Sequence, residues 1–296
     1  MAKKQWFYGK NILLTGVSSG IGFYMAKLFA SKYDCNIFGI GRNLEKLENA
    51  KKEIDKEIEF GFLKKKNKKN RGSFEYVSMD ISSFEKWNEL KILLDEKGFK
   101  VDVLINNAGI MLPFDRFENQ SIEDVKRVFE TNLFAHMYSY KTFLEDLKKA
   151  KGAIINISSS SALCSVAGEA IYGASKSADK SFTESISIEH KKDIYIAYVC
   201  PGFTSTDLFR GENEMSKLVK SVCMPAQKMA KKIVKSIARK KKRIVLGIDA
   251  HFMSGLNRIA PRTASNTISE VLRISKDSMF DKVYPENVVK KQSKKR

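Results

Sequence analysis

Residues 12–30, ILLTGVSSGIGFYMAKLFA, join a short apolar run to a longer amphipathic run through a turn that contains three glycines. The apolar run predicts a buried β-strand, and the second run predicts a helix over about residues 21–31. Gly16, Gly20 and Gly22 lie where the strand gives way to the helix. Glycine lets backbone N–H groups approach a phosphate closely, and the positive end of the helix points at the same place. This stretch therefore predicts a βα unit with an anion-binding turn.

The spacing of these glycines is G-x-x-x-G-x-G, which differs from the G-x-G-x-x-G fingerprint of most dinucleotide-binding folds. Taken alone, the turn is equally compatible with a loop that is simply rich in turn residues. Motifs further along the chain are needed to separate the two interpretations.

Short apolar runs continue to alternate with longer amphipathic runs beyond this unit. Further strands are predicted at residues 35–41, 74–79, 101–106, 153–158, 194–200 and 243–248, and further helices at 44–57, 84–97, a long stretch ending at Ala150, 172–190 and 226–239. Strands joined through helices pair in parallel with right-handed crossovers. The predicted fold class is α/β, a single-domain Rossmann-type doubly wound parallel sheet with helices on both faces. Ligands of such sheets bind beyond the carboxyl ends of the strands.

No internal repeat or shift of composition divides the chain, so residues 1–296 are predicted to form one domain. Its core covers about residues 9–248, followed by a C-terminal helical extension over 249–285 and a basic tail over 286–296. Residues 61–72, GFLKKKNKKNRG, interrupt the rhythm and are predicted to form a solvated lysine-rich loop.

The formal net charge of +19 raises the question of nucleic-acid or membrane binding. The charge is mostly lysine spread through the chain, and clusters of arginine with aromatic residues are missing. A solvated surface is therefore expected, and no nucleic-acid partner. Neither a secretory leader nor an apolar run of membrane-spanning length is recognised. We expect a cytoplasmic protein with reduced cysteines, and a weak peripheral contact with membrane as the alternative.

Six motifs then follow one another along about residues 9–210. They are TGVSSGIG (15–22), NNAG (106–109), TNLF around Asn132, the serine run 158–161, YGASK (172–176) and PGFTST (201–206). Their order and placement resemble the short-chain dehydrogenase/reductase (SDR) family, although a single motif of this kind would be unspecific.

The resemblance implies a nicotinamide dinucleotide site. The positions that match are Gly16, Ser18, Ser19, Gly20, Ile21, Gly22, Asp80, Ile81, Asn107, Ala108, Gly109, Tyr172, Lys176, Pro201, Gly202 and Thr206. Asp80 would contact the adenine edge, and Thr206 would hold the nicotinamide carboxamide. The alternatives are that Asp80 belongs to the start of a helix and that Asn106 braces neighbouring strands.

The end of the second strand predicts which dinucleotide is preferred. An acid there would bind the ribose 2′-hydroxyl and repel a 2′-phosphate. Here the strand ends in GIGRN, with Arg42 and no acid before Glu45. A guanidinium matches a phosphate in charge and geometry, so NADP(H) is expected to be preferred over NAD(H). The alternative is that Arg42 is an ordinary surface charge.

Tyr172 and Lys176 lie four residues apart on a predicted helix and so share one face. A neighbouring ammonium favours the phenolate and brings the tyrosine pKa toward neutral pH, which suits a general acid and base. The resemblance adds a serine hydroxyl for the carbonyl oxygen and gives Asn132 the role of organising a water near the lysine. Family spacing places the serine thirteen residues before the tyrosine, at Ser159, or fourteen before it, at Ser160.

The predicted function is interconversion of a ketone or aldehyde and an alcohol, with Tyr172 as general acid and base. The expected substrate is hydrophobic or lipid-like, with Met111, Leu112, Phe114, Phe203, Leu208, Phe209, Met215 and apolar residues of 252–259 as its walls. Alternatives are a non-catalytic dinucleotide-binding regulator and a basic nucleic-acid or membrane-surface binding protein. The resemblance implies a homodimer or homotetramer. The three histidines show no metal-ligand spacing, so no metal is predicted.

Overall fold

The first strand, β1 (Asn11–Thr15), runs directly into the glycine turn, and α1 (Gly20–Tyr33) begins within it. The computed structural model describes residues 5–63, 71–206, 223–275 and 277–287. Gly16 has φ 72° at the turn, a left-handed conformation that favours glycine.

Seven parallel strands form the central sheet, in the order β3-β2-β1-β4-β5-β6-β9. The bounds of the other six are β2 (Asn36–Gly41), β3 (Ser73–Ser78), β4 (Val103–Asn106), β5 (Ala153–Ile157), β6 (Tyr195–Pro201) and β9 (Arg243–Leu246). The strand order reverses between β1 and β4, and such a point opens a crevice at the carboxyl ends of the strands.

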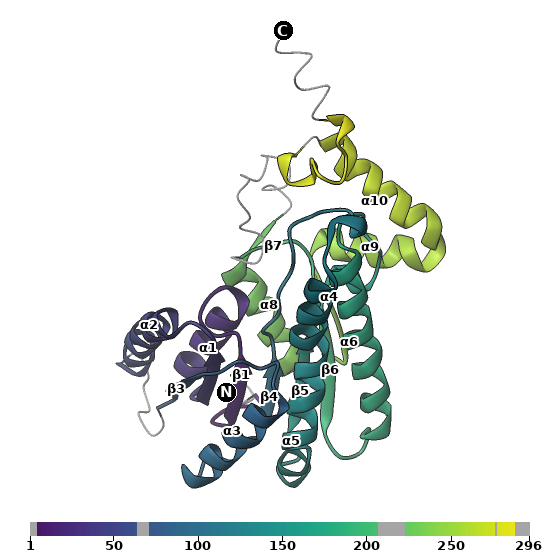
Figure 1. Cartoon of the computed structure of the whole chain (residues 1–296). Coiled ribbons are helices and arrows are strands. Elements are labelled where there is room, and N and C mark those ends of the chain that lie inside the picture. The colour runs from purple at the N-terminus through teal and green to yellow at the C-terminus, as the bar shows by residue number, and fades with distance from the viewer. Residues whose placement is uncertain (1–4, 64–70, 207–222, 276, 288–296) are drawn as a thin grey trace.

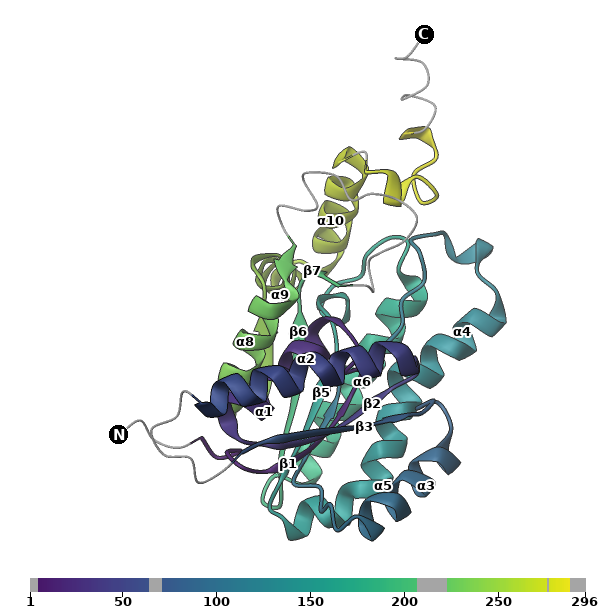
Figure 2. The same cartoon turned by 90° about the vertical axis from the view of Figure 1, so that its left-hand side faces the viewer.

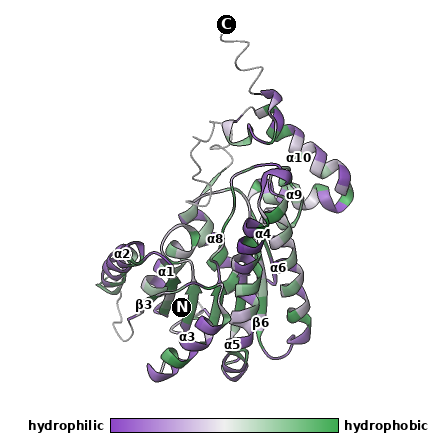
Figure 3. Ribbon diagram, in the orientation of Figure 1, coloured by the Kyte–Doolittle hydropathy of each residue, from purple (hydrophilic) through white to green (hydrophobic). Residues whose placement is uncertain are grey.

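Helices cover both faces of this sheet (Figures 1 and 2). One face carries α1, α2 (Leu44–Leu63) and α8 (Ala226–Ala238), and the other carries α3 (Phe84–Glu96), α5 (Ala135–Lys149) and α6 (Ala170–Glu189). Hydrophobic residues follow the strands, and α2 is largely hydrophilic (Figure 3). The predicted Rossmann-type doubly wound α/β fold is confirmed.

Two predicted helices differ from those in the structure. The helix expected to end at residue 57 continues to Leu63 as α2. Gly61 permits this, because a Cβ there would lie 2.8 Å from the carbonyl oxygen of Ser31, so the last turns of α2 lie closely against α1. The predicted lysine-rich loop begins correspondingly later, and its residues 64–70 lie outside the described part of the chain.

The long helical stretch before Ala150 is divided into three pieces. It consists of α4 (Ile122–Phe129), a π-helical turn over Glu130–Phe134 and α5. Shorter elements are β7 (Thr204–Ser205), β8 (Met224–Pro225) and 3₁₀ turns at Phe117–Asn119, Ser160–Ala162 and Ser278–Phe280.

The C-terminal extension lies at the carboxyl-end side of the sheet (Figure 1). It contains α9 (Ile248–Ile259) and α10 (Pro261–Ser275). Phe280 follows α10 and packs edge-on against Phe114, with 4.7 Å between the ring centres. A separate apolar cluster thus joins the extension to the loop after β4. Within the described ranges, every helix is too short or too polar to cross a bilayer.

Candidate active site

A cavity of about 1080 Å³ lies at the carboxyl ends of the strands. Most residues predicted to bind a cofactor line it, namely Gly16, Ser18, Ser19, Gly20, Ile21, Arg42, Asp80, Ile81, Asn107, Ala108, Gly109, Tyr172, Lys176, Pro201, Gly202 and Thr206. These residues come from the ends of several strands, so the parallel sheet itself brings them together.

Gly22 is the predicted cofactor residue that does not line the cavity. It is buried behind the turn, where a Cβ would overlap the carbonyl oxygen of Gly16 and the amide nitrogen of Asn107. The Asn107 amide nitrogen donates to the carbonyl oxygens of Thr15 (3.0 Å) and Gly16 (3.2 Å). Gly22 and Asn107 therefore shape the turn from behind, and the turn presents its backbone to the cavity. Such a cradle fits a pyrophosphate.

Asp80 and Asn106 have distinct environments. One carboxylate oxygen of Asp80 accepts hydrogen bonds from the backbone N–H (3.0 Å) and hydroxyl (2.9 Å) of Ser82. The loop after β3 is thereby bent so that Asp80 reaches the cavity wall. Asn106 is buried and donates to Asn156 Oδ1 at 2.9 Å, which ties β4 to β5. Asn106 thus braces neighbouring strands.

Arg42 follows β2 with an exposed side chain that borders the cavity. Its backbone carbonyl accepts from the Ser78 hydroxyl at 2.9 Å, which fixes this end of β2 against β3. In the described part of the chain, its guanidinium makes no hydrogen bond or ion pair. The cation is thus available to a ligand at the same edge as the glycine turn.

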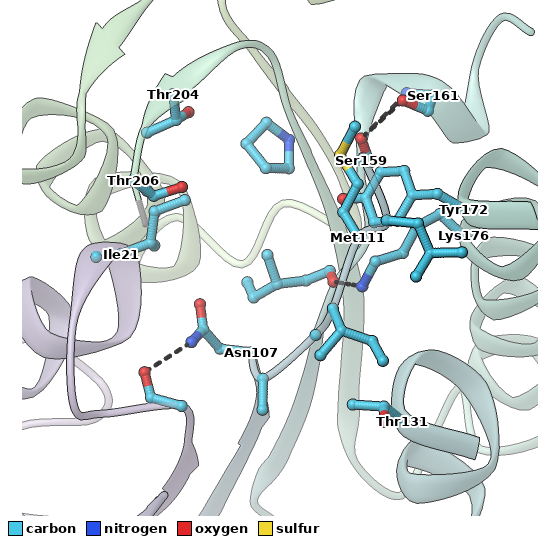
Figure 4. A pocket seen from close by; sticks show the side chains of 18 of the residues that line it. Ile21, Asn107, Met111, Thr131, Ser159, Ser161, Tyr172, Lys176, Thr204 and Thr206 are labelled. Carbon is cyan, nitrogen blue, oxygen red and sulfur yellow. Dashed lines mark hydrogen bonds between the residues drawn. The ribbon is translucent and has the colours of Figure 1, made fainter. Parts of the chain in front are cut away.

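Tyr172 and Lys176 lie on the first turns of α6, and both side chains are buried at the cavity wall (Figure 4). The Lys176 ammonium donates to the carbonyl oxygen of Ile157 at 2.9 Å, which holds it at the end of β5. Burial lowers the pKa of Lys176, and the negative charge of Asp179 opposes that shift. The lysine is therefore fixed in position from the strand below it.

The pKa of Tyr172 shifts upward, whereas the sequence predicts a shift toward neutral pH. Burial raises the pKa of Tyr172, opposed by a hydrogen bond with the Ser159 side chain. The negative charges of Glu169 and Asp179 also raise this pKa, so the surroundings of the phenol favour its neutral form. The phenol therefore stays protonated at neutral pH, which is the form that can donate a proton.

The serine run divides into hydroxyls with different directions. The Ser158 hydroxyl donates to the carbonyl oxygen of Lys176 at 2.8 Å, so its hydrogen is engaged with the α6 backbone although the residue lines the cavity. The Ser159 side chain contacts Tyr172 and lies 3.2 Å from the Ser161 hydroxyl (Figure 4). Ser160 begins the 3₁₀ turn and also borders the cavity. Of the two candidates, Ser159 is the one that contacts the tyrosine.

Asn132 does not line the cavity. It is completely buried in the π-helical turn. Its amide accepts from the backbone N–H of Ile110 (2.8 Å) and donates to the Ile110 carbonyl (2.9 Å) and the Ser175 hydroxyl (3.1 Å). Asn132 therefore ties the loop after β4 to α6. A wide turn at this position agrees with the frequent use of π-turns at functional sites.

Apolar side chains form part of the cavity wall, beside the polar residues Glu169, Ser278, Asp281 and Lys282. Met111, Leu112, Phe114 and Phe203 line it as predicted, and Met253 joins them from α9. Two other members of the predicted apolar set point elsewhere, since Phe252 is 56% exposed and Ile259 is 85% exposed. The predicted wall residues Leu208, Phe209 and Met215 lie outside the described residues.

Sequence reasoning missed part of this wall. The additional lining residues are Val166, Glu169, Ser278, Met279, Asp281 and Lys282. The position of Glu169, one helical turn before Tyr172, was an available signal. Residues 278–282 reach the cavity only through the packing of the C-terminal extension. Among the described residues, no three His, Cys, Asp or Glu side chains gather as metal ligands would.

The fold and site define a class, the doubly wound α/β proteins with a phosphate-sized glycine cradle where the strand order reverses. Comparison with protein families makes the assignment more specific. The family model described as short chain dehydrogenase matches residues 10–217. The chain belongs to the short-chain dehydrogenase family.

Several relatives are similar to the chain along much of its length. The Arabidopsis thaliana protein 11-beta-hydroxysteroid dehydrogenase 1A is 33% identical over 221 residues, which cover 70% of this chain and 57% of that protein. The Bos taurus protein 3-ketodihydrosphingosine reductase is 30% identical over 266 residues, covering 86% of this chain and 77% of that one. The matched region thus spans less than two thirds of the plant relative.

Solved structures share the fold. A short-chain dehydrogenase from Streptomyces avermitilis superposes with a TM-score of 0.71 at 23% identity, covering 90% of this chain and 97% of that one. A short-chain dehydrogenase from Sphingobium yanoikuyae in complex with NADPH gives 0.68 at 21% identity, with coverage of 90% and 95%. At these identities the likeness concerns the fold.

Proposed function

We propose that the protein is an NADP(H)-dependent oxidoreductase that interconverts a ketone or aldehyde and an alcohol on an apolar skeleton. The observation that carries the proposal is the joint position of Tyr172, Ser159 and Lys176 on one cavity wall, between the glycine cradle and the apolar side chains of the wall. A phenol can donate a proton to a carbonyl oxygen, and a hydroxyl and an ammonium can stabilise the charge that develops during reduction.

The glycine turn, Asp80 and Thr206 would hold the dinucleotide along the polar part of the cavity. NADPH, when bound, supplies the hydride that becomes attached to the carbonyl carbon. The Sphingobium yanoikuyae enzyme was solved in complex with NADPH and a Burkholderia phymatum short-chain dehydrogenase/reductase in complex with NAD, which supports this cofactor class. The preference for NADP(H) rests on Arg42, whose free guanidinium suits a 2′-phosphate.

The chain's own residues would act on the carbonyl oxygen. Tyr172 is protonated in the chain by itself and would donate its phenolic proton to the oxygen as the alcohol forms. Ser159 would donate a hydrogen bond to the same oxygen as negative charge develops there. Lys176, held by the Ile157 carbonyl, would favour the resulting phenolate. Asn132 would act by holding the Ile110 loop against α6.

The substrate class follows from the apolar side chains of the cavity wall, namely Met111, Leu112, Phe114, Phe203 and Met253. Burial of an apolar skeleton there would contribute about 25 cal/mol per Å². Two relatives are named for a hydroxysteroid and for 3-ketodihydrosphingosine, both of which agree with a lipid-like ketone.

The test is NADPH oxidation with a panel of apolar and polar ketones and aldehydes. Ser159→Ala is expected to lower kcat about 10²-fold, because one donor to the developing oxyanion is lost. Ser160→Ala is the matched comparison, and a larger loss in that variant would transfer the assignment to Ser160. A protein that binds NADPH but reduces none of these compounds would instead be a non-catalytic dinucleotide-binding protein.

Arg42→Asp is expected to change the cofactor preference. Loss of one charged hydrogen-bond partner and gain of a repelling carboxylate should lower kcat/KM for NADPH relative to NADH by roughly 10- to 100-fold. The measurement is the ratio of kcat/KM with the two cofactors on one ketone. Arg42→Lys keeps the charge and should retain most of the preference. An unchanged ratio in Arg42→Asp would contradict the assignment.

The associations expected from the sequence are also proposals. Ile248, Phe252 and Ile259 are exposed along α9, at spacings of four and seven residues that place them on one side of the helix. Such an apolar stripe on a basic protein suits weak contact with an anionic membrane surface. Sedimentation with and without anionic vesicles tests this contact and the proposed homodimer or homotetramer together. A monomer that does not sediment with the vesicles would contradict both the membrane contact and the homo-oligomer.

A further inference from the structure

A chain of polar groups leads from Tyr172 to a buried carboxyl that the proposed mechanism does not use. Ser159 is hydrogen-bonded to Tyr172, and its hydroxyl lies 3.2 Å from the Ser161 hydroxyl. The Ser161 hydroxyl in turn lies 2.7 Å from Glu169 Oε2. Glu169 immediately precedes α6, is only 5% exposed and borders the cavity. Figure 4 shows Ser159 and Ser161 side by side next to Tyr172.

The direction of these hydrogen bonds depends on the charge of Glu169. An ionised carboxylate can only accept, so Ser161 must donate to it, and Ser159 then donates to Ser161. In that arrangement the single hydrogen of Ser159 points at Ser161, and the bond between Ser159 and Tyr172 is donated by the phenol. A neutral Glu169 can instead donate to Ser161, and Ser161 can donate to Ser159. The hydrogen of Ser159 is then free to point at a carbonyl oxygen in the cavity.

We propose that Glu169 is a positioning residue whose charge, relayed through Ser161, sets whether the Ser159 hydroxyl can donate to the substrate. This inference rests on the proposed reductase function and adds a residue to it. Neutral Glu169 favours reduction, and ionised Glu169 opposes it. Glu169 itself acts only through the two serines.

The environment of Glu169 puts its titration in the neutral range. Burial raises its pKa to about 7, and the hydrogen bond from Ser161 opposes that shift. From α6 it interacts with Tyr172, whose phenol is neutral. The charged groups of the segments packed nearby are Asp115 and Arg116 after β4 and Asp281 and Lys282 near the C-terminus. Lys282 lies 3.8 Å from Asp115, so these two charges offset one another.

The sign of the pH effect follows directly. At a pH below the pKa of Glu169, the carboxyl is neutral and the Ser159 hydroxyl can donate to the substrate. At a pH above this pKa, the Ser159 hydroxyl donates to Ser161 instead. In wild type, the single-turnover rate of ketone reduction should fall roughly five- to tenfold between about pH 6 and about pH 8.5, the equivalent of one net hydrogen bond.

Glu169→Gln is the decisive variant, because its amide can donate to Ser161 at every pH. This variant should stay active, and its reduction rate should no longer decrease between about pH 6 and about pH 8.5. Ser161→Ala breaks the relay, so in this variant too the reduction rate should no longer decrease between the two pH values. A merely structural role of Glu169 does not predict that result. The matched controls are Ser165→Ala, on an exposed part of the same loop, and Glu189→Gln, exposed at the other end of α6. Both should keep the wild-type pH profile.

A second readout needs no turnover. In protein labelled with ¹³C at the glutamate carboxyl carbons, the resonance missing from Glu169→Gln identifies Glu169. Its midpoint is expected near the pKa of about 7, and it should rise further in Ser161→Ala, which removes the hydrogen bond that lowers it. A midpoint at the ordinary glutamate value of 4.5 would overturn the proposal.

The outcomes separate the two proposals. Absence of turnover in wild type on every ketone would remove the reductase function, and the positioning role of Glu169 with it. Turnover with an unchanged pH profile in Glu169→Gln would overturn the relay and leave the reductase intact. A Glu169→Gln effect confined to the KM of ketones that carry an ammonium group would also overturn the relay, because Glu169 would then be a substrate contact.

Discussion

Replacing Tyr172 with phenylalanine is expected to lower ketone turnover by about 10²- to 10⁴-fold, the range for loss of a general acid. The change removes only the hydroxyl, and the ring keeps its buried position on α6. Binding of NADPH and the free energy of unfolding should therefore remain close to wild type. The measurements are kcat on the best ketone of the panel and NADPH fluorescence on binding.

Tyr198→Phe is the control for this experiment. Tyr198 is also a buried tyrosine, and its hydroxyl donates to Glu184 at 2.8 Å from β6, away from the cavity lining. Burial raises the pKa of both phenols, so the two substitutions remove similar groups from similar surroundings. Equal losses in the two variants, or a Tyr172→Phe variant within a few fold of wild type, would contradict the proposed role of Tyr172.

The raised pKa of Tyr172 also separates two sources of pH dependence. A phenol with its pKa above the ordinary value remains protonated throughout the neutral range, so the proton donor for reduction is present at pH 6 and at pH 8 alike. Loss of reductase activity in that interval would therefore come from another group. Glu169, with a pKa of about 7, lies on the cavity wall and is expected to change charge in this interval.

Much of the fold was predictable because its signals are local. The strand and helix of residues 12–30, the alternation of apolar and amphipathic runs, and the order of the glycine, NNAG and YGASK motifs all lie in short stretches. Parallel pairing then follows from the helical crossovers. The extended end of α2 was missed because Gly61 looks like a loop residue, whereas its small size permits contact with α1.

The site was less predictable where it depends on distant packing. Glu169 is visible in the sequence, but its burial arises partly because Phe114 and Val283 pack against neighbouring Gly168. Asn132 shows the opposite case. Its motif stands out in the sequence, yet its amide is fully engaged with Ile110 and Ser175 behind the cavity. Neither feature follows from spacing along the chain.

A buried pair between the helices that flank the site gives the largest expected effect on stability. His136 Nδ1 lies 2.7 Å from Asp179 Oδ1, and the two side chains are 1% and 0% exposed. The pair joins α5, just after the turn that carries Asn132, to α6, one turn beyond Lys176. The negative charge of Asp179 also opposes the fall in the pKa of Lys176 caused by burial.

His136→Ala is expected to lower the free energy of unfolding by about 3–5 kcal/mol, measured by urea denaturation, because it leaves the Asp179 carboxylate buried without its partner. Asp179 has little other support, since its Oδ2 has no hydrogen-bond partner among the described residues. The double substitution His136→Leu and Asp179→Leu removes both polar groups and should recover most of the loss.

The pair of His190 with Asp193, at 3.3 Å, is the comparison, because the Asp193 side chain is 50% exposed although that of His190 is only 13% exposed. Losing a surface pair of this kind should cost less than about 1 kcal/mol, because water replaces the missing partner. If His136→Ala costs no more than His190→Ala, the buried pair does not stabilise the junction of α5 and α6. If the double leucine variant is as unstable as His136→Ala, an unpaired carboxylate does not explain the loss. The effect is assigned to the buried charge of Asp179 only if His136→Ala lowers the free energy of unfolding and the double leucine variant recovers most of that loss.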